Sequence, residues 1–450
     1  MIMPVSFSDP SQHVSQPRRQ DARELAVQVL QRLDGEHFPV QAVLNRVLAS
    51  AACDPADAAL CSELCYGALR MEIRLRWLLA RFLRMPERLP PRMRIVLLIA
   101  VYALVFLEGM PGYAVVDWAV GSVKRKHGQT LSRVANGCLR AVCREGSALR
   151  DYAYYRGVSQ DEQAQQALYY ALPLWIVRLW HEEYGPEKAA LLMAKSSARP
   201  AAGFRVNRIR ADWVGLSRQL EHSGMQCLAP ACFATTAEMR SHLAEQCAFT
   251  ALLAAGRLSR QGAASQLALH ALCPETWPDP LWDACAGQGT KSCALLEFGK
   301  DVRIASDTHL PRLRHVRGEC RRLCLPQPVL VQASALYPPF ACKSATILLD
   351  VPCSGLGVLA ARPDIRRHRK ADDVLKLIRL QAAMLEVSYA ELSSGGHIAY
   401  ITCTQNPAEN EDQIRSFCSR HPAAVLVNEW NSPAENVLLE GMYAALLRKR

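Results

Sequence analysis

Two cysteines stand out because each lies at the end of a predicted strand, just after a short apolar run. Cys353 lies in ILLDVPCSGLG, residues 347–357, and Cys403 lies in HIAYITCTQNPAEN, residues 397–410. A thiolate can add to an electron-poor ring and make the neighbouring carbon nucleophilic. A second thiol or thiolate could then act as the base that collapses the adduct. A free cysteine is most often a small buried apolar residue, and we assign that role to most of the 17 cysteines.

A glycine-containing turn follows another apolar run in DACAGQGTK, residues 283–291. The pattern predicts a strand that ends at Asp283 and a turn with Gly287 and Gly289 that opens a helix. Backbone amides at such a helix start bind anions, and glycine allows close approach of a ligand. The next predicted strand ends at Asp307, and an acid about this far along commonly binds a ribose diol. The pair fits a nucleoside-containing cofactor, either a dinucleotide or S-adenosylmethionine, and the two cysteine motifs favour the second.

The positive net charge of the chain favours a polyanionic partner, most often a nucleic acid. The chain of 450 residues has 53 Lys and Arg against 42 Asp and Glu, a net charge of +11. One basic cluster follows Cys353 directly, so we expect phosphate contacts there. Its members are Arg362, Arg366, Arg367, Arg369 and Lys370. The arginines of 314–321 have helical spacing, and we expect them to form a solvated helix face.

Periodicity divides the chain into four parts. Residues 1–20 are polar and predicted to be disordered. Residues 21–147 have helical patterns only, which predicts an all-α bundle, and 148–258 predict a helical linker followed by a small α+β subdomain. From 259 to 450 strands and helices alternate, which predicts a Rossmann-like α/β domain with a mostly parallel sheet and ligands at the carboxyl ends of its strands. The apolar run at 95–107 is too short to cross a membrane and predicts a buried helix.

Cysteine usage and the N-terminal residues narrow the class of protein. The cysteines are odd in number and include no CxxC pair, which is typical of a reducing compartment and unlike a disulfide scaffold or a zinc site. The first 20 residues have no apolar core of the signal-peptide kind. We therefore expect a cytoplasmic protein with no metal and no membrane partner, and we expect a monomer.

The motifs resemble a known family. Residues 260–450 resemble the RNA cytosine-5 methyltransferases of the Nol/Nop/Sun type, on LLDVPCSGLG with RPDI downstream and on YITCTQNPAENE. The whole chain is similar to the bacterial branch of that family that acts on 16S ribosomal RNA and carries an N-terminal NusB-like domain. That similarity includes ELCYGALR at 63–70, RVANGCLRAVCRE at 133–145, FRVN at 204–207 and QGAASQLA at 261–268. It implies that residues 21–147 bind RNA and that S-adenosylmethionine is the cofactor.

The resemblance also implies roles for single residues. Cys403 would add to carbon 6 of cytosine, and Cys353 would assist removal of the carbon-5 proton and release of the enzyme. Asp350 would lie near the target base and the methionine end of the cofactor, and Asp307 would bind the ribose. The other cofactor residues would be Asp283, Cys285, Ala286, Gly287, Gln288, Gly289, Lys291, Arg312 and Ser334. The RNA contacts would be Arg362, Arg366, Arg367 and Lys370.

Three other functions stay open at this point. The same chemistry could act on transfer RNA, because only the NusB-like half favours ribosomal RNA, and it does so by analogy. A non-catalytic RNA-binding ribosome-assembly factor with a relic cofactor site is the second alternative, and the intact cysteine pair argues against it. A nicotinamide-dependent oxidoreductase is the third, and it leaves both cysteine motifs unexplained.

Overall fold

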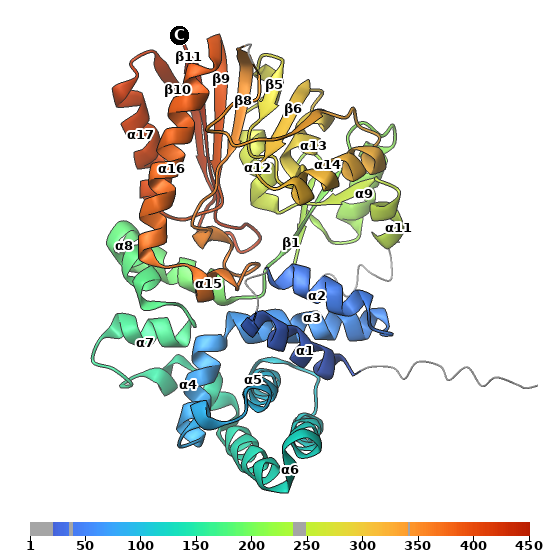
Figure 1. Cartoon of the computed structure of the whole chain (residues 1–450), viewed down its shortest axis with the longest axis vertical. Helices are drawn as coiled ribbons and strands as arrows, with labels where there is room; N and C mark the ends of the chain where they lie inside the picture. Colours follow the sequence, from blue (N-terminus) through green and yellow to red (C-terminus); the bar gives the residue numbers. More distant parts are fainter. Residues whose placement is uncertain (1–20, 36–38, 237–248, 341–342) are drawn as a thin grey trace, which may run out of the picture. The chain divides into compact units, whose positions relative to one another are not determined.

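The computed structural model describes residues 21–35, 39–236, 249–340 and 343–450. The tail predicted for 1–20 lies outside the described residues. The chain forms two compact units, residues 1–156 and 157–450, and Figure 1 labels most of their helices and several of their strands. The predicted domain limits at 147 and 258 stay predictions.

The first unit is helical, as predicted, and its described residues contain no strand. Its α-helices are α1 (Ala22–Gly35), α2 (Val40–Ala49), α3 (Pro55–Arg70), α4 (Glu72–Phe82), α5 (Pro91–Phe106) and α6 (Gly112–Glu145). Asp21 begins α1, because its carboxylate accepts the Arg23 N–H at 2.8 Å. Eleven of the sixteen α5 residues are buried, which confirms the core helix expected from its apolar run.

A small antiparallel sheet opens the second unit after two helices, α7 (Glu162–Tyr169) and α8 (Leu174–Ser197). Its strands are β1 (Ala202–Val206), β2 (Gln226–Ala229), β3 (Cys232–Thr235) and β4 (Leu258–Arg260), in the order β2-β3-β1-β4. Two helices, α9 (Trp213–His222) and α11 (Phe249–Ala254), accompany it. Leucines of α9 pack with Phe204 and Phe233 in a core of its own. This is the α+β arrangement that the turn-rich sequence predicts.

The large sheet carries the predicted alternation of strands and helices. Its strands are β5 (Leu281–Asp283), β6 (Val302–Asp307), β7 (Val329–Gln332), β8 (Ser344–Asp350), β9 (Leu392–Thr402), β10 (Ala424–Asn431) and β11 (Tyr443–Lys449). The order is β10-β11-β9-β8-β5-β6-β7. The strands β5 to β9 pair in parallel, and β11 pairs antiparallel with both β9 and β10. The sheet is therefore mostly parallel, with an antiparallel hairpin at one side.

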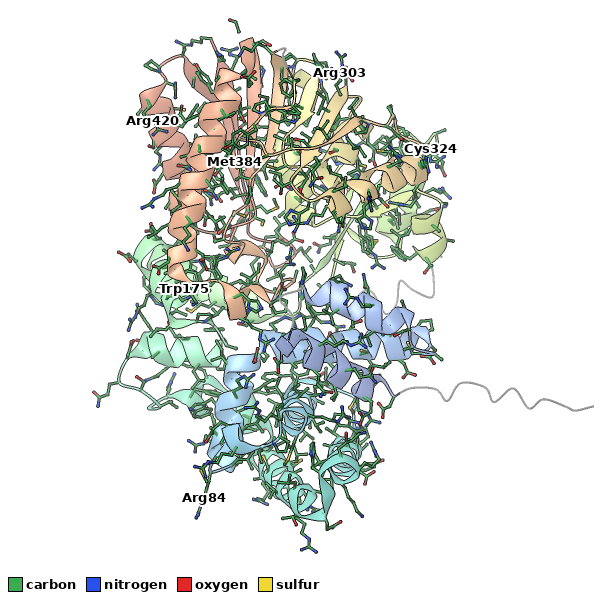
Figure 2. The ribbon with its side chains drawn as sticks, in the orientation of Figure 1. Arg84, Trp175, Arg303, Cys324, Met384 and Arg420 are labelled. Carbon is green, nitrogen blue, oxygen red and sulfur yellow. The ribbon has the colours of Figure 1, made fainter. Side chains whose placement is uncertain are left out.

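Helices cover both faces of this sheet, so its parallel strands are buried on both sides. One face packs against α12 (Ala263–Ala271), α13 (Thr290–Glu297) and α14 (Leu310–Leu323). The other packs against α16 (Ala371–Ala390) and α17 (Glu411–Arg420), drawn in orange and red in Figure 1. Alternation along the strands assigns the residues: Leu348 belongs to the first face, and Ile347 and Leu349 to the second. Met384 of α16, labelled in Figure 2, is part of the second core.

The strand order reverses between β5 and β8, since β6 and β7 extend the sheet to one side and β9 to the other. Ligands of open α/β sheets bind at the carboxyl ends of the strands at such a point. Asp283, Asp307 and Asp350 are the last residues of β5, β6 and β8, and Cys403 directly follows β9. No helix of the described residues is long and apolar enough to cross a membrane.

Candidate active site

The structure brings the two sequence-predicted cysteines together. The Sγ atoms of Cys353 and Cys403 lie 3.2 Å apart, and the Cys403 N–H donates to Cys353 Sγ at 3.3 Å. Their loops follow the neighbouring parallel strands β8 and β9, whose register sets Asp350 opposite Ile401. Both thiols are free and half-buried. A single reacting carbon could therefore lie near both sulfur atoms.

The surroundings make the two thiols electrostatically unequal. The hydrogen bond from Cys353 lowers the pKa of Cys403 although burial opposes this, and the cations Lys291 and Arg362 lower it further. The hydrogen bond to Cys403 and burial raise the pKa of Cys353, and the Glu409 carboxylate adds to the rise. Cys403 is consequently the thiol that ionises first and Cys353 the one that keeps its proton. A thiolate is the nucleophilic form of cysteine.

Lys291 lies beside Asp350 at this rim. Its Nζ is 2.6 Å from Asp350 Oδ2, which joins the first turn of α13 to the end of β8. Burial by itself would lower the pKa of the Lys291 ammonium, but the attraction and hydrogen bond of Asp350 outweigh it and raise that pKa. The Lys291 ammonium therefore stays charged next to the thiols.

The glycine turn between β5 and α13 is anchored to the acid at the end of β6. Asp307 Oδ2 accepts the Gly287 N–H at 3.0 Å, and Oδ1 accepts the His309 N–H at 2.8 Å. Gly287 has φ 55° and Gly289 has φ 82°, in the left-handed region that favours glycine. A Cβ on Gly287 would meet no atom within 4 Å, whereas one on Gly289 would lie 2.9 Å from Val316 of α14. There is thus open space over Gly287, next to a carboxylate held in place by backbone amides.

Asp283 supports this turn from inside the sheet. Its side chain is 1% exposed and accepts hydrogen bonds from Ser292 Oγ and the Cys285 N–H. Burial raises its pKa to about 7, with the Ser292 hydrogen bond acting against the rise. The neighbouring Ala286 N–H donates to the Ser306 carbonyl at 2.9 Å. Asp283 therefore stabilises the turn between β5 and α13 from inside the protein.

Three further residues are predicted to bind a cofactor. Ser334 follows β7, is half-buried, and its Oγ accepts the Leu336 N–H at 3.2 Å. Arg312 lies exposed in the first turn of α14, and Gln288 is exposed between the two glycines. Their contacts with a cofactor stay predictions.

The basic cluster after Cys353 divides into two kinds of residue. Arg362 and Lys370 are exposed, and Arg367 is half-buried. Arg366 is 7% exposed, and its guanidinium donates to the carbonyls of Tyr170, Ala171 and Ser196. The prediction that Arg366 contacts phosphate does not fit this placement, because its donors are directed into the protein. The sequence pattern missed this because buried and exposed arginines are alike in a charge run.

Arg369, another member of the cluster, contacts the first cysteine loop. Its Nη2 donates to the Cys353 carbonyl at 3.5 Å. The sequence also gave no sign of Glu409, whose side chain is fully buried behind the two cysteine loops. A buried acid has no signature of its own in a sequence, since its partners lie far away along the chain.

Backbone contact closes the region behind the thiols. The Gly357 N–H donates to the Cys403 carbonyl at 3.2 Å, and the Gly441 N–H donates to the Gly357 carbonyl at 2.8 Å. A Cβ on Gly357 would lie 1.8 Å from the Gly441 carbonyl oxygen. A cavity of about 450 Å³ borders these segments, with Trp180 and Lys195 among its lining residues. The cavity lies beside the cysteine loops and is not lined by the Asp307 carboxylate.

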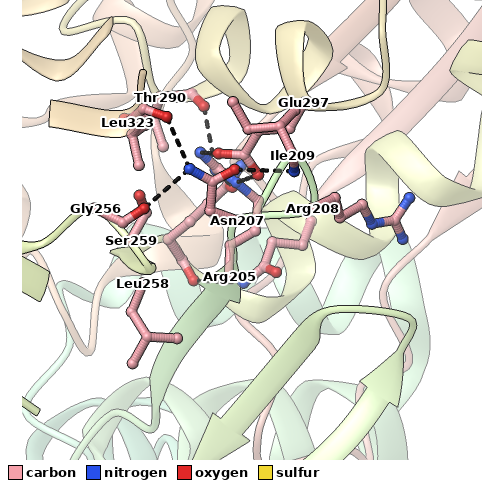
Figure 3. Close-up of polar contacts among 12 residues, drawn as sticks. Arg205, Asn207, Arg208, Ile209, Gly256, Leu258, Ser259, Thr290, Glu297 and Leu323 are labelled. Carbon is pink, nitrogen blue, oxygen red and sulfur yellow. Dashed lines mark hydrogen bonds and ion pairs between the residues drawn. The ribbon is translucent and has the colours of Figure 1, made fainter. Parts of the chain in front are cut away.

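The small sheet is fixed to α13 by a buried ion pair, drawn in Figure 3. Arg205 of β1 donates through Nε and Nη2 to both Glu297 oxygens, at 2.9 and 3.0 Å. Arg205 also donates to the Thr290 carbonyl at the other end of α13 and to the Gln261 side chain. Asn207 donates to the carbonyls of Gly256 and Leu323. The FRVN segment therefore secures the helix whose first turn carries Lys291.

Comparison with family models gives two matches. Residues 270–446 match the family described as 16S rRNA methyltransferase RsmB/F, and residues 20–144 match the NusB family. The first match contains every cysteine, acid and lysine of the site described above.

Comparison with individual proteins extends the likeness to most of the chain. Ribosomal RNA small subunit methyltransferase B of Vibrio cholerae serotype O1 is 31% identical over 88% of this chain and 90% of the relative. The probable ribosomal RNA small subunit methyltransferase B of Bacillus subtilis (strain 168) is 27% identical over 90% of each chain. The crystal structure of PH0851 aligns with a TM-score of 0.73 at 17% identity, over 95% of this chain and 98% of that one. At this identity the structural likeness shows the fold alone.

Proposed function

Because this chain belongs to the family of ribosomal RNA small subunit methyltransferase B, a family of RNA methyltransferases, we propose that it methylates carbon 5 of a cytosine in 16S ribosomal RNA. The observation that carries the proposal is the pair of thiols 3.2 Å apart at the ends of β8 and β9. Carbon 5 of cytosine is a weak nucleophile, and addition of a thiolate at carbon 6 is a chemical means of activating it.

The residues at the β5–β6 edge fit S-adenosylmethionine. A ribose diol needs a carboxylate acceptor, and Asp307 is held by two backbone amides beside the open space over Gly287. Asp350 and Lys291 would lie at the methionine end, between this turn and the thiols. When bound, the cofactor supplies an electrophilic methyl group on a sulfonium sulfur.

The thiols divide the work in the proposed reaction. The Cys403 thiolate would add to carbon 6, and the electrons of the carbon 5–carbon 6 double bond would then form the new bond from carbon 5 to the methyl carbon as the methyl–sulfur bond of the donor breaks and its electrons stay on sulfur. Once Cys403 is bonded to carbon 6, it no longer carries the charge that raises the Cys353 pKa, so the Cys353 thiol can release its proton to solvent and, as a thiolate, accept the proton from carbon 5. The electrons of that C–H bond restore the double bond, and Cys403 leaves as a thiolate. Since the Cys353 pKa is raised and that of Cys403 is lowered, the nucleophile and the proton-handling group are already distinguished before substrate binds.

Contacts with RNA are proposed for the exposed Arg362 and Lys370 and for the half-buried Arg367. Arg362, Arg367 and Lys370 follow the first cysteine loop and could reach phosphates on either side of the target nucleotide. The NusB-like unit is proposed as a second RNA-binding part. A cytoplasmic location accords with such a substrate and with two catalytic thiols that must stay reduced.

The test is methyl transfer from labelled S-adenosylmethionine to 16S ribosomal RNA, small ribosomal subunits and transfer RNA in parallel. We expect label in 5-methylcytosine of the ribosomal RNA with the natural chain and none with Cys403→Ala. Label in transfer RNA alone would support the alternative substrate. Cofactor binding without transfer to any RNA would overturn the enzymatic proposal. Bisulfite sequencing of total RNA with and without the gene would locate the nucleotide.

A further inference from the structure

Glu409 is a fully buried carboxylate surrounded by hydrogen-bond donors. Its Oε1 accepts the Ser354 N–H at 2.8 Å and Gln381 Nε2 at 3.0 Å. Its Oε2 accepts Ser354 Oγ at 2.5 Å and Asn406 Nδ2 at 3.0 Å. None of its described contacts is an ion pair with Lys or Arg. A buried acid without a cation is costly unless its acceptors are satisfied, and here polar groups satisfy both oxygens.

Two of the residues bonded to Glu409 are the immediate neighbours of the two thiols. Ser354 directly follows Cys353, and Thr404 directly follows Cys403. The Ser354 and Thr404 hydroxyl oxygens lie 2.6 Å apart, and Thr404 Oγ1 is 3.5 Å from Glu409 Oε2. A hydrogen-bonded bridge therefore runs between the two loops one residue beyond the thiol pair.

Helix α16 and the end of β9 hold this bridge in place. Gln381 Nε2 donates both to Glu409 and to the Pro352 carbonyl at 2.9 Å, just before Cys353. The Tyr400 hydroxyl donates to the Glu409 carbonyl at 2.7 Å. The β8–β9 ladder ends at Asp350 and Ile401, so beyond it the loops need other contacts to keep their spacing.

We propose that Glu409 is a positioning residue that fixes the Cys353 and Cys403 loops against each other, so that both sulfur atoms face one cytosine ring. The proposal rests on the function proposed above. Chemistry that passes from one thiol to the other depends on this spacing, and a displacement of about 1 Å can cost about 100-fold in rate. The negative charge of Glu409 also contributes to the raised pKa of Cys353, which supports the same assignment.

The test compares Glu409→Gln with Glu386→Gln, which changes a half-buried acid of α16 whose hydrogen bonds go to Arg420 and His421 and not to the cysteine loops. The glutamine at 409 keeps the volume, but its NH₂ group faces N–H donors in either orientation. We expect single-turnover methyl transfer to fall by about 10- to 100-fold, with the dissociation constant for RNA unchanged within about twofold. Glu386→Gln should lower the unfolding temperature and leave the rate of the folded protein unchanged.

A second readout needs no RNA and no turnover. Iodoacetamide alkylation of the Cys353 and Cys403 peptides, followed by mass spectrometry, gives the pH at which each thiol ionises. The charged groups near the pair are Asp350 at the end of β8, Lys291 on α13, Arg362 and Arg369 in the first cysteine loop, and Glu409 after the second. Removing the Glu409 charge should lower the pH of half-maximal Cys353 alkylation, because that carboxylate raises the Cys353 pKa.

The outcomes separate this proposal from the one beneath it. A natural chain that makes no 5-methylcytosine overturns the proposed function, whatever the alkylation shows. An active natural chain with an equally active Glu409→Gln and unchanged alkylation overturns the role of Glu409. A loss of rate fully explained by the unfolded fraction, measured by circular dichroism in the same buffer, would also overturn it.

Discussion

Lys291 and Asp350 form an ion pair that joins the first turn of α13 to the carboxyl end of β8. The two residues have opposite effects on one thiol, since the charge of Lys291 lowers the pKa of Cys403 and that of Asp350 raises it. Lys291 lies in the helix that follows the glycine turn, and Asp350 ends the strand before Cys353. The ionisation of the proposed nucleophile is therefore coupled to groups that border the proposed methyl donor.

Changes to this pair should move the Cys403 ionisation in opposite directions. Lys291→Met should raise the pH of half-maximal Cys403 alkylation because a cation is lost. Asp350→Asn should lower it because an anion is lost. Alkylation of the Cys403 peptide across pH 5–10, without RNA, measures both shifts. Shifts of the same sign in the two variants would contradict this account.

The two cysteines should fail in different ways. Cys403→Ser should abolish methyl transfer, because a serine hydroxyl is scarcely ionised near neutral pH and is a much weaker nucleophile than a thiolate. Cys353→Ala should still allow Cys403 to attack, so that the adduct forms and does not collapse. Denaturing gel electrophoresis should then show a protein–RNA complex with Cys353→Ala that is absent from the double variant. A complex formed by Cys403→Ala instead would mean that the roles are exchanged.

Asp307 should account for much of the cofactor affinity. Loss of one buried, charge-assisted hydrogen bond costs about 1.5–3 kcal/mol, or about 10- to 150-fold in affinity. Isothermal titration of S-adenosylmethionine into Asp307→Ala should show this loss. Asp301→Ala is the matched control, because Asp301 is an exposed acid paired with Arg303 just before the same strand. Equal affinity in both variants would remove Asp307 from the site.

Loss of one partner of the ion pair between Arg205 and Glu297 should destabilise the protein, because both side chains are buried. Their side chains are 7% and 1% exposed, so removing one partner leaves the other charge without solvent. Arg205→Met should lower the free energy of unfolding of residues 157–450 by about 3–5 kcal/mol. The double variant, Arg205→Met with Glu297→Met, should recover most of that loss. Urea denaturation followed by tryptophan fluorescence gives both values. A double variant no more stable than the single one would show that the charges themselves are needed.

RNA binding should depend on salt through the exposed members of the basic cluster. The logarithm of affinity should fall linearly with the logarithm of salt concentration, with a slope of about −0.7 per neutralised phosphate in a single strand. Arg362→Gln and Lys370→Gln should each reduce that slope by about this amount. Arg303→Gln, an exposed arginine of β6 labelled in Figure 2, is the control. An affinity indifferent to salt would contradict the phosphate contacts.

Much of this architecture follows from local sequence patterns. Apolar periodicity gives the helical first unit and the alternation of strands and helices, and the parallel sheet then places every strand-end acid and cysteine at one edge. The β10–β11 hairpin was not predicted, because its position depends on pairing β11 between β9 and β10 and not on its own residues. The same limit explains why the buried contacts of Arg366 and Glu409 were not predicted from the sequence. Their roles are decided by carbonyls and hydroxyls that lie tens to hundreds of residues away along the chain.

The contact between Gly357 and Gly441 restricts natural variation where no chemistry takes place. Even the methyl group of alanine at position 357 would overlap the Gly441 backbone, directly behind the Cys403 carbonyl. Genetic drift at this position is thus confined to one amino acid. A random mutagenesis screen for loss of function would return Gly357 together with the two cysteines, although glycine has no side-chain group that could react. Intolerance of substitution there would report the shape of the backbone and not a step of the reaction.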